Sequence, residues 1–135
     1  MALSYMLDSD ICIYLMKNRY AKISQKFASF QTGEICISVV TYGELYFGAS
    51  KSQHVSKNMS AIHELLLTLP ALTLDENAAL HYGDIRAILE LKGQTIGSND
   101  LWIAAHARSQ GITLVSNNLR EFSRVPDLLL ENWTN

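Results

Sequence analysis

The sequence has no apolar run long enough to cross a membrane, and it has only two cysteines. Its longest apolar runs, such as residues 65–67 and 128–130, are far shorter than the roughly 20 residues that a membrane-spanning helix needs. The first six residues lack the basic flank and the apolar stretch of a secretory signal. Cys12 and Cys36 each stand between two isoleucines, where a free cysteine usually packs as a small core residue. We therefore expect a cytoplasmic protein without membrane contact.

The sequence also lacks an excess of positive charge. Its formal net charge is −2, so the field of the whole molecule does not attract nucleic acid. Any contact with RNA would need a local basic patch, and the densest one comprises Lys17, Arg19, Lys22 and Lys26. This patch is either a nucleic-acid contact or the solvated face of a helix, and the sequence leaves both interpretations open.

Several common functional motifs are absent as well. The sequence contains no Gly-x-Gly-x-x-Gly or Walker loop, which gives no support to a nucleotide-cofactor role. It contains no Cys-x-x-Cys pair, and His54, His63, His81 and His106 show no paired spacing. The sequence therefore argues against a zinc site.

What the sequence does contain is an alternation of short apolar strands and helices. Pro70, Gly93 and Gly111 are expected to end three of the helices, and Thr41 is a candidate cap for the helix after the second strand. Such alternation predicts a three-layer α/β/α sandwich with a mainly parallel sheet, built by residues 1–135 as a single domain. The expected strands are residues 5–7, 35–39, 72–74, 112–115 and 128–130, and the main helices are expected to begin near residues 9, 20, 41, 55, 75 and 98.

Three carboxylates occupy the positions where such a fold builds a ligand site. Asp8 ends the first strand, Glu44 lies one turn into the helix after the second strand, and Asp100 starts the apolar helix before the strand at 112–115. Residues 116–118, Ser-Asn-Asn, directly follow that strand. Because ligands bind beyond the carboxyl ends of parallel strands, these side chains are expected to share one crevice.

Each acid also has a purely structural interpretation. Asp8 and Asp100 are suited to helix capping or to the positive end of a helix dipole, and a lone helical glutamate such as Glu44 is often merely solvated. Taken together, three carboxylates in one crevice would repel one another unless they bind protons or a cation. Oxygen ligands with open positions suit Mg²⁺ or Mn²⁺, and such an ion favours in-line hydrolysis of a nucleic-acid backbone.

Four segments of the sequence resemble the motifs of PIN-domain ribonucleases, especially the VapC toxins of bacterial toxin–antitoxin pairs. The first segment is residues 6–15 (Met-Leu-Asp-Ser-Asp-Ile-Cys-Ile-Tyr-Leu). The second, residues 38–49, contains Glu44, and the third, residues 96–107, contains Asp100. The fourth is residues 114–126. The likeness extends from about Tyr5 to Trp133, with all four motifs in order.

The resemblance implies Mg²⁺ or Mn²⁺ dependence, a homodimer and inhibition by a cognate VapB antitoxin. Operator DNA would be contacted only through that antitoxin. It also implies cleavage of initiator tRNA in the anticodon stem-loop, which blocks translation. Asp8 and Asp100 would be direct metal ligands, and Glu44 would bind the metal through water or orient the attacking water. Asn118 would position that water.

The sequence departs from the family pattern at two positions. Many members carry a fourth acid where this chain has Asn118, whose amide can orient a water but supplies no charge. Asp10 stands where the opening motif usually has asparagine. Its extra carboxylate either strengthens metal binding or faces away as a first-turn helix residue, and we favour the second interpretation.

Two rival functions remain open from sequence. Asp8-Ser-Asp10 after a strand matches the Asp-x-Asp of haloacid-dehalogenase-like phosphatases, whose first aspartate is a nucleophile, although a downstream lysine and a second acidic pair are not evident. The other rival is a non-catalytic PIN-type binding module. A further segment is ambiguous, because Ile62, Leu65, Leu66 and Leu69 would suit either a partner surface or the core.

Overall fold

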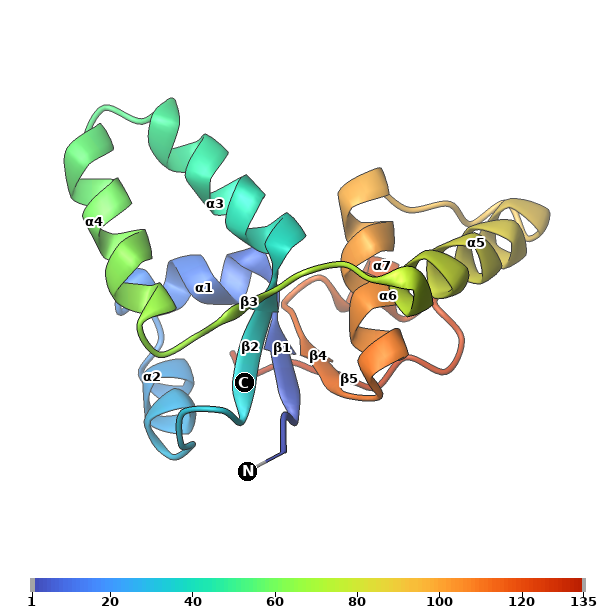
Figure 1. Ribbon diagram of the computed structural model, residues 1–135, viewed down its shortest axis with the longest axis horizontal. Helices are drawn as coiled ribbons and strands as arrows, with labels where there is room; N and C mark the ends of the chain where they lie inside the picture. Colours follow the sequence, from blue (N-terminus) through green and yellow to red (C-terminus); the bar gives the residue numbers. More distant parts are fainter. Residues whose placement is uncertain (1, 135) are drawn as a thin grey trace.

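A five-stranded, wholly parallel sheet forms the middle layer of the computed structural model, which describes residues 2–134 (Figure 1). The strands lie in the order β3-β2-β1-β4-β5, so the chain begins in the middle of the sheet and builds outward on both sides. Their bounds are β1 Tyr5–Leu7, β2 Ile35–Ser38, β3 Ala71–Leu72, β4 Thr113–Val115 and β5 Leu130–Glu131. The predicted parallel sheet is confirmed.

Helices cover both faces of this sheet. Figure 1 shows α1 to α4 on one side and α5 and α6 on the other. The helices are α1 Ser9–Met16, α2 Ala21–Ala28, α3 Val39–Ser50, α4 Val55–Leu66, α5 Glu76–Leu91, α6 Ser98–Gln110 and α7 Leu119–Phe122. The predicted three-layer α/β/α sandwich is therefore confirmed.

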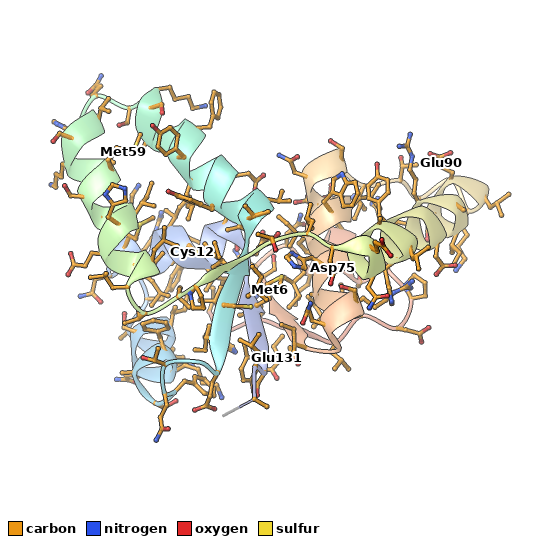
Figure 2. The ribbon with its side chains drawn as sticks, in the orientation of Figure 1. Met6, Cys12, Met59, Asp75, Glu90 and Glu131 are labelled. Atoms are coloured by element: carbon orange, nitrogen blue, oxygen red, sulfur yellow. The ribbon has the colours of Figure 1, made fainter. Side chains whose placement is uncertain are left out.

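Two separate cores explain why the strands are apolar on every residue rather than on alternate ones. Met6 and Leu114 pack toward α5 and α6, whereas their neighbours Leu7 and Val115 pack with α1, α3 and α4. All four side chains are fully buried. Because successive strand residues point to opposite faces, a sheet covered on both sides needs apolar residues throughout. Figure 2 labels Met6 in the first core and Cys12 in the second.

The second strand ends one residue earlier than expected, and the expected cap at Thr41 is wrong. Ser38 caps α3 instead, because its extended backbone lets its hydroxyl accept a hydrogen bond from the Val40 N–H at 3.1 Å. Thr41 is buried inside the first turn of the helix. The Ser38 hydroxyl also lies 2.8 Å from Nδ1 of the buried His106, which ties the start of α3 to α6.

The remaining differences are small. The two edge strands are only two residues long, and each is displaced by one or two residues from its predicted position. In the ambiguous 55–69 segment, Ile62 and Leu69 are buried, and Leu65 and Leu66 pack against the same core, so this stripe belongs to the core. Both cysteines are buried and free, as predicted for core residues. Among residues 2–134, no helix has the length and apolar character that crossing a bilayer would require.

Candidate active site

The carboxyl ends of β1 and β4 bring the first candidate site residues together. These strands are parallel neighbours in which Leu7 pairs with Val115, so the next residues, Asp8 and Ser116, emerge side by side. The Asp8 N–H donates to the Val115 carbonyl at 2.9 Å, and the Ser116 hydroxyl donates to Asp8 Oδ2 at 2.8 Å. Sheet register alone therefore joins two residues that are 108 positions apart.

Asp8 is both a helix cap and a buried acid. Its Oδ1 accepts a hydrogen bond from the Ser9 N–H at 2.8 Å, so Asp8 does cap α1. Only 6% of the residue is exposed. Burial, followed by the charge of Asp10, raises the pKa of Asp8 to about 6, although hydrogen bonds from Ser116 and Ser9 oppose the rise. A cap on the protein surface would not carry this electrostatic cost.

Glu44 reaches this site from α3 and is held by two other helices. The Ser9 hydroxyl at the start of α1 donates to Glu44 Oε1, and the Asn99 amide at the start of α6 donates to Glu44 Oε2 at 3.3 Å. The carboxylate is therefore fixed between α1 and α6 rather than free in solvent. Neither Ser9 nor Asn99 was expected from the sequence to hold it.

Asp100 faces the same crevice from the first turn of α6. Burial raises the pKa of its carboxyl to about 7, assisted by a hydrogen bond to Glu121 and by the charges of Asp8, Glu121 and Glu44. The charges of these acids act on one another across the crevice, which is the convergence that the sequence predicted for Asp8, Glu44 and Asp100.

Asn118 lies at the edge of the crevice, but its amide is turned toward another acid. Its N–H donates to the Ser116 hydroxyl at 2.9 Å, and its Nδ2 donates to Glu121 Oε2 at 3.1 Å. Glu121 thus contacts both Asn118 and Asp100. Sequence reasoning missed Glu121, although its position three residues after Asn118 in a helical turn is a signal that could have identified it.

The expectation that Asp10 faces away from the site is wrong. Its Oδ2 accepts a hydrogen bond from the Asn117 N–H at 3.0 Å, so the Asp10 side chain links α1 to the loop after β4. Burial raises the pKa of Asp10, and its charge in turn contributes to the raised pKa of Asp8.

Five carboxylates act on one another through their charges at this edge of the sheet: Asp8, Asp10, Glu44, Asp100 and Glu121. Within the described residues, 2–134, no lysine, arginine or histidine forms a salt bridge with any of them. The phosphatase alternative needs such a lysine, and the structure gives it no support.

The donor set fits a hard divalent cation. All its ligand atoms are oxygens, and burial, followed by the neighbouring acidic groups, raises the pKa values of Asp8 and Asp100, so their ionised forms are costly without a cation. In the described part of the chain, no three acidic, histidine or cysteine side chains form a ready-made metal cage. Mg²⁺ does not require one, because it commonly binds one or two carboxylates and keeps several waters.

Comparison with known proteins agrees with the fold. The PIN domain family matches residues 5–128 of the chain. "Ribonuclease VapC2" of Haemophilus influenzae is 47% identical over 131 residues, which cover 97% of this chain and 98% of that protein. The "tRNA(fMet)-specific endonuclease VapC" of Shigella flexneri is 43% identical over 132 residues, with coverage of 98% and 99%.

Solved structures show the same likeness. A DNA-bound VapBC complex from Salmonella typhimurium matches with a TM-score of 0.92 and 41% identity, covering 97% of this chain and 98% of that one. VapBC2 from Rickettsia felis, bound to a promoter DNA fragment, matches with a TM-score of 0.89 and 38% identity, covering 97% and 99%.

Proposed function

Since the chain belongs to the PIN-domain family, among the VapC ribonucleases of VapBC toxin–antitoxin systems, we propose that it cleaves initiator tRNA within the anticodon stem-loop and so blocks translation. We further propose that the reaction depends on Mg²⁺, with Mn²⁺ as a possible substitute. The observation that carries this proposal is the set of uncompensated carboxylates at the carboxyl edge of the sheet.

In this proposal each acid has a distinct task. Asp8 and Asp100 hold the metal, because they are the two acids whose pKa values rise most and whose repulsion a cation would relieve. Bound there, the ion would polarise the scissile phosphodiester and lower the pKa of a water. Glu44, held by Ser9 and Asn99, orients that water or binds the metal through one, and Asn118 helps to position it.

The choice of RNA rests on the relatives. Proteins 43% and 41% identical to this chain, from Shigella flexneri and Salmonella typhimurium, are named tRNA(fMet)-specific endonucleases. Because both alignments span nearly the whole chain, the same substrate is proposed here.

The decisive test is to incubate the purified protein with initiator tRNA and to sequence the 5′ ends of the fragments. We expect one cut in the anticodon stem-loop, no cleavage in EDTA and recovery with added Mg²⁺, because the carboxylates alone provide no electrophile. An elongator tRNA is the matched control and should stay intact. Cuts scattered over all RNA would refute the tRNA assignment, cleavage in EDTA would refute the metal, and no cleavage at all would favour a binding module.

The partners proposed are a VapB-type antitoxin, a second copy of the chain and, through the antitoxin only, operator DNA. A groove lined by residues of α1, α3 and α4 includes Glu44, so a segment lying in it would cover that acid. Tyr46 and Phe47 on α3 and Leu80 on α5 are exposed apolar residues available to a dimer. The free chain should have twice its 15.1 kDa mass by light scattering and should bind antitoxin in that state. A single-chain mass at micromolar concentration would contradict the dimer.

A further inference from the structure

A second groove, between α2 and the chain's last residues, has a positive character that the acidic crevice lacks. It has a volume of about 520 Å³, and the residues lining it include Lys22, Lys26, Glu131, Asn132 and Trp133. The acid on its wall, Glu131, accepts a hydrogen bond from Trp133 Nε1 at 3.1 Å. The lining therefore carries two positive charges against one negative charge.

This positive charge is concentrated in one part of the chain. Residues 11–33 contain four cations and no acid, whereas the whole chain carries −2, so the remainder carries −6. Within residues 2–134 the salt bridges lie on α5 and α6, and none involves Arg19, Lys22 or Lys26. These side chains are exposed, so their charges are available to a ligand. The fourth cation, Lys17, lines the other groove and is not part of this surface.

A chain of hydrogen bonds connects the groove to the acidic crevice through Asn117. The Asn132 amide on the groove wall donates to Asn117 Oδ1 at 3.0 Å, and the Asn117 N–H donates to Asp10 at 3.0 Å. The Asn117 amide also donates to the Tyr14 hydroxyl at 3.3 Å. The lysine groove and the proposed cleavage site are therefore neighbours on one surface.

The aromatic ring of Tyr14 and the guanidinium of Arg19 lie beside this chain of hydrogen bonds. The Arg19 guanidinium lies 5.9 Å from the centre of the Tyr14 ring, and Tyr20 packs edge-on against the same ring. Cations next to aromatic rings are a combination typical of sites that bind single-stranded nucleic acid.

We propose that this groove, defined by Lys22, Lys26 and Asn132, holds the RNA backbone on one side of the cut, with the two lysines binding phosphates. The inference rests on the proposed function and adds to it the path that the substrate takes. Phosphate contacts position an RNA strand without reading its bases, so the groove contributes binding and leaves the choice of sequence to other residues. It also explains how a chain with net negative charge can bind a polyanion.

The test is the double variant Lys22→Gln and Lys26→Gln, compared with a matched Lys51→Gln and Lys92→Gln variant. Lys51 and Lys92 follow α3 and α5, and Figure 1 shows the ends of these helices far from α2. We expect the first variant to raise KM for initiator tRNA about tenfold with kcat nearly unchanged, because each lost phosphate contact weakens binding by a few-fold. The slope of log(kcat/KM) against log[salt] should also become shallower by roughly 1.4 to 1.8. The control variant should leave both quantities unchanged.

The outcomes separate this inference from the function on which it rests. If the wild type cleaves tRNA and the groove variant matches the control in KM and salt slope, the path is wrong and the proposed function stands. A fall in kcat at unchanged KM, or weaker binding of antitoxin alone, would also overturn the inference. Equal melting temperatures for the two double variants exclude a folding defect as the cause of a raised KM.

Discussion

The Asp8→Asn protein is expected to lose RNA cleavage and, in the absence of metal, to become more stable at neutral pH. Removing a metal-binding carboxylate should forfeit several kcal/mol of transition-state stabilisation, which corresponds to a loss of about a thousandfold or more in rate. Asparagine keeps an oxygen for the Ser9 N–H and an amide that can pair with the Ser116 hydroxyl, so the cap and the strand-end contact survive. Only the charge is removed.

The gain in stability follows from the raised pKa of Asp8. The folded protein retains this proton up to about pH 6, whereas the unfolded chain loses it near 3.8. The free energy of unfolding therefore falls as the pH rises between these values, and the loss is complete above pH 6. Urea unfolding in EDTA should show no difference between variant and wild type below pH 4 and an advantage of about 1 to 3 kcal/mol for the variant at pH 7.5.

Asp75→Asn is the matched control for this substitution. Asp75 also caps a helix, accepting from the Ala78 N–H at 3.0 Å, but it is exposed and lies outside the crevice. Its replacement should leave cleavage nearly unchanged. If Asp8→Asn destabilises the metal-free protein at pH 7.5, the buried charge stabilises the fold and our account of the crevice is wrong.

The fold could be predicted from the sequence because its signals are local. The strands β1, β2 and β4 are short apolar runs between helical patterns, and Gly111 ends α6 with the positive φ of 67° that favours glycine. The sequence predicts the positions of the edge strands β3 and β5 less accurately. Each has a single neighbouring strand and only two residues, so pairing, rather than sequence pattern, fixes its position.

The same difference between local signals and long-range contacts applies to the candidate site. Asp8, Glu44 and Asp100 could be found because each stands at a predictable junction of strand and helix. The contacts that orient them could not, because they join distant parts of the chain: Ser9 and Glu44 are 35 residues apart, and Asn99 and Glu44 are 55 apart. The wrong orientation for Asp10 has the same cause, since its partner Asn117 is 107 residues away.

The position of Asn118 leads to the last prediction, which concerns Glu121. The resemblance described from the sequence implies an acid where this chain has Asn118. Here the Asn118 amide donates to Glu121, which also shares a hydrogen bond with Asp100. We therefore expect Glu121, one helical turn further along the chain, to supply the carboxylate that is absent at 118. The hydrogen bond to Glu121 and its charge both contribute to the raised pKa of Asp100, so a metal bound by Asp100 would also relieve the repulsion between these two acids.

We expect Glu121→Gln to raise the Mg²⁺ concentration for half-maximal cleavage by about 10- to 100-fold, the usual effect of losing a residue that supports a metal ligand. The pKa of Asp100 should fall from about 7 toward its ordinary value, because the neighbouring charge is removed and the new amide can donate to the carboxylate. The acidic limb of the pH–rate profile at saturating Mg²⁺ should consequently move to lower pH. Glu90→Gln, which removes an exposed acid paired with Arg86 on α5, is the control and should change neither quantity. An unchanged Mg²⁺ requirement in Glu121→Gln would show that Glu121 does not replace the acid missing at Asn118, since a carboxylate that supports the metal cannot be neutralised without weakening its binding.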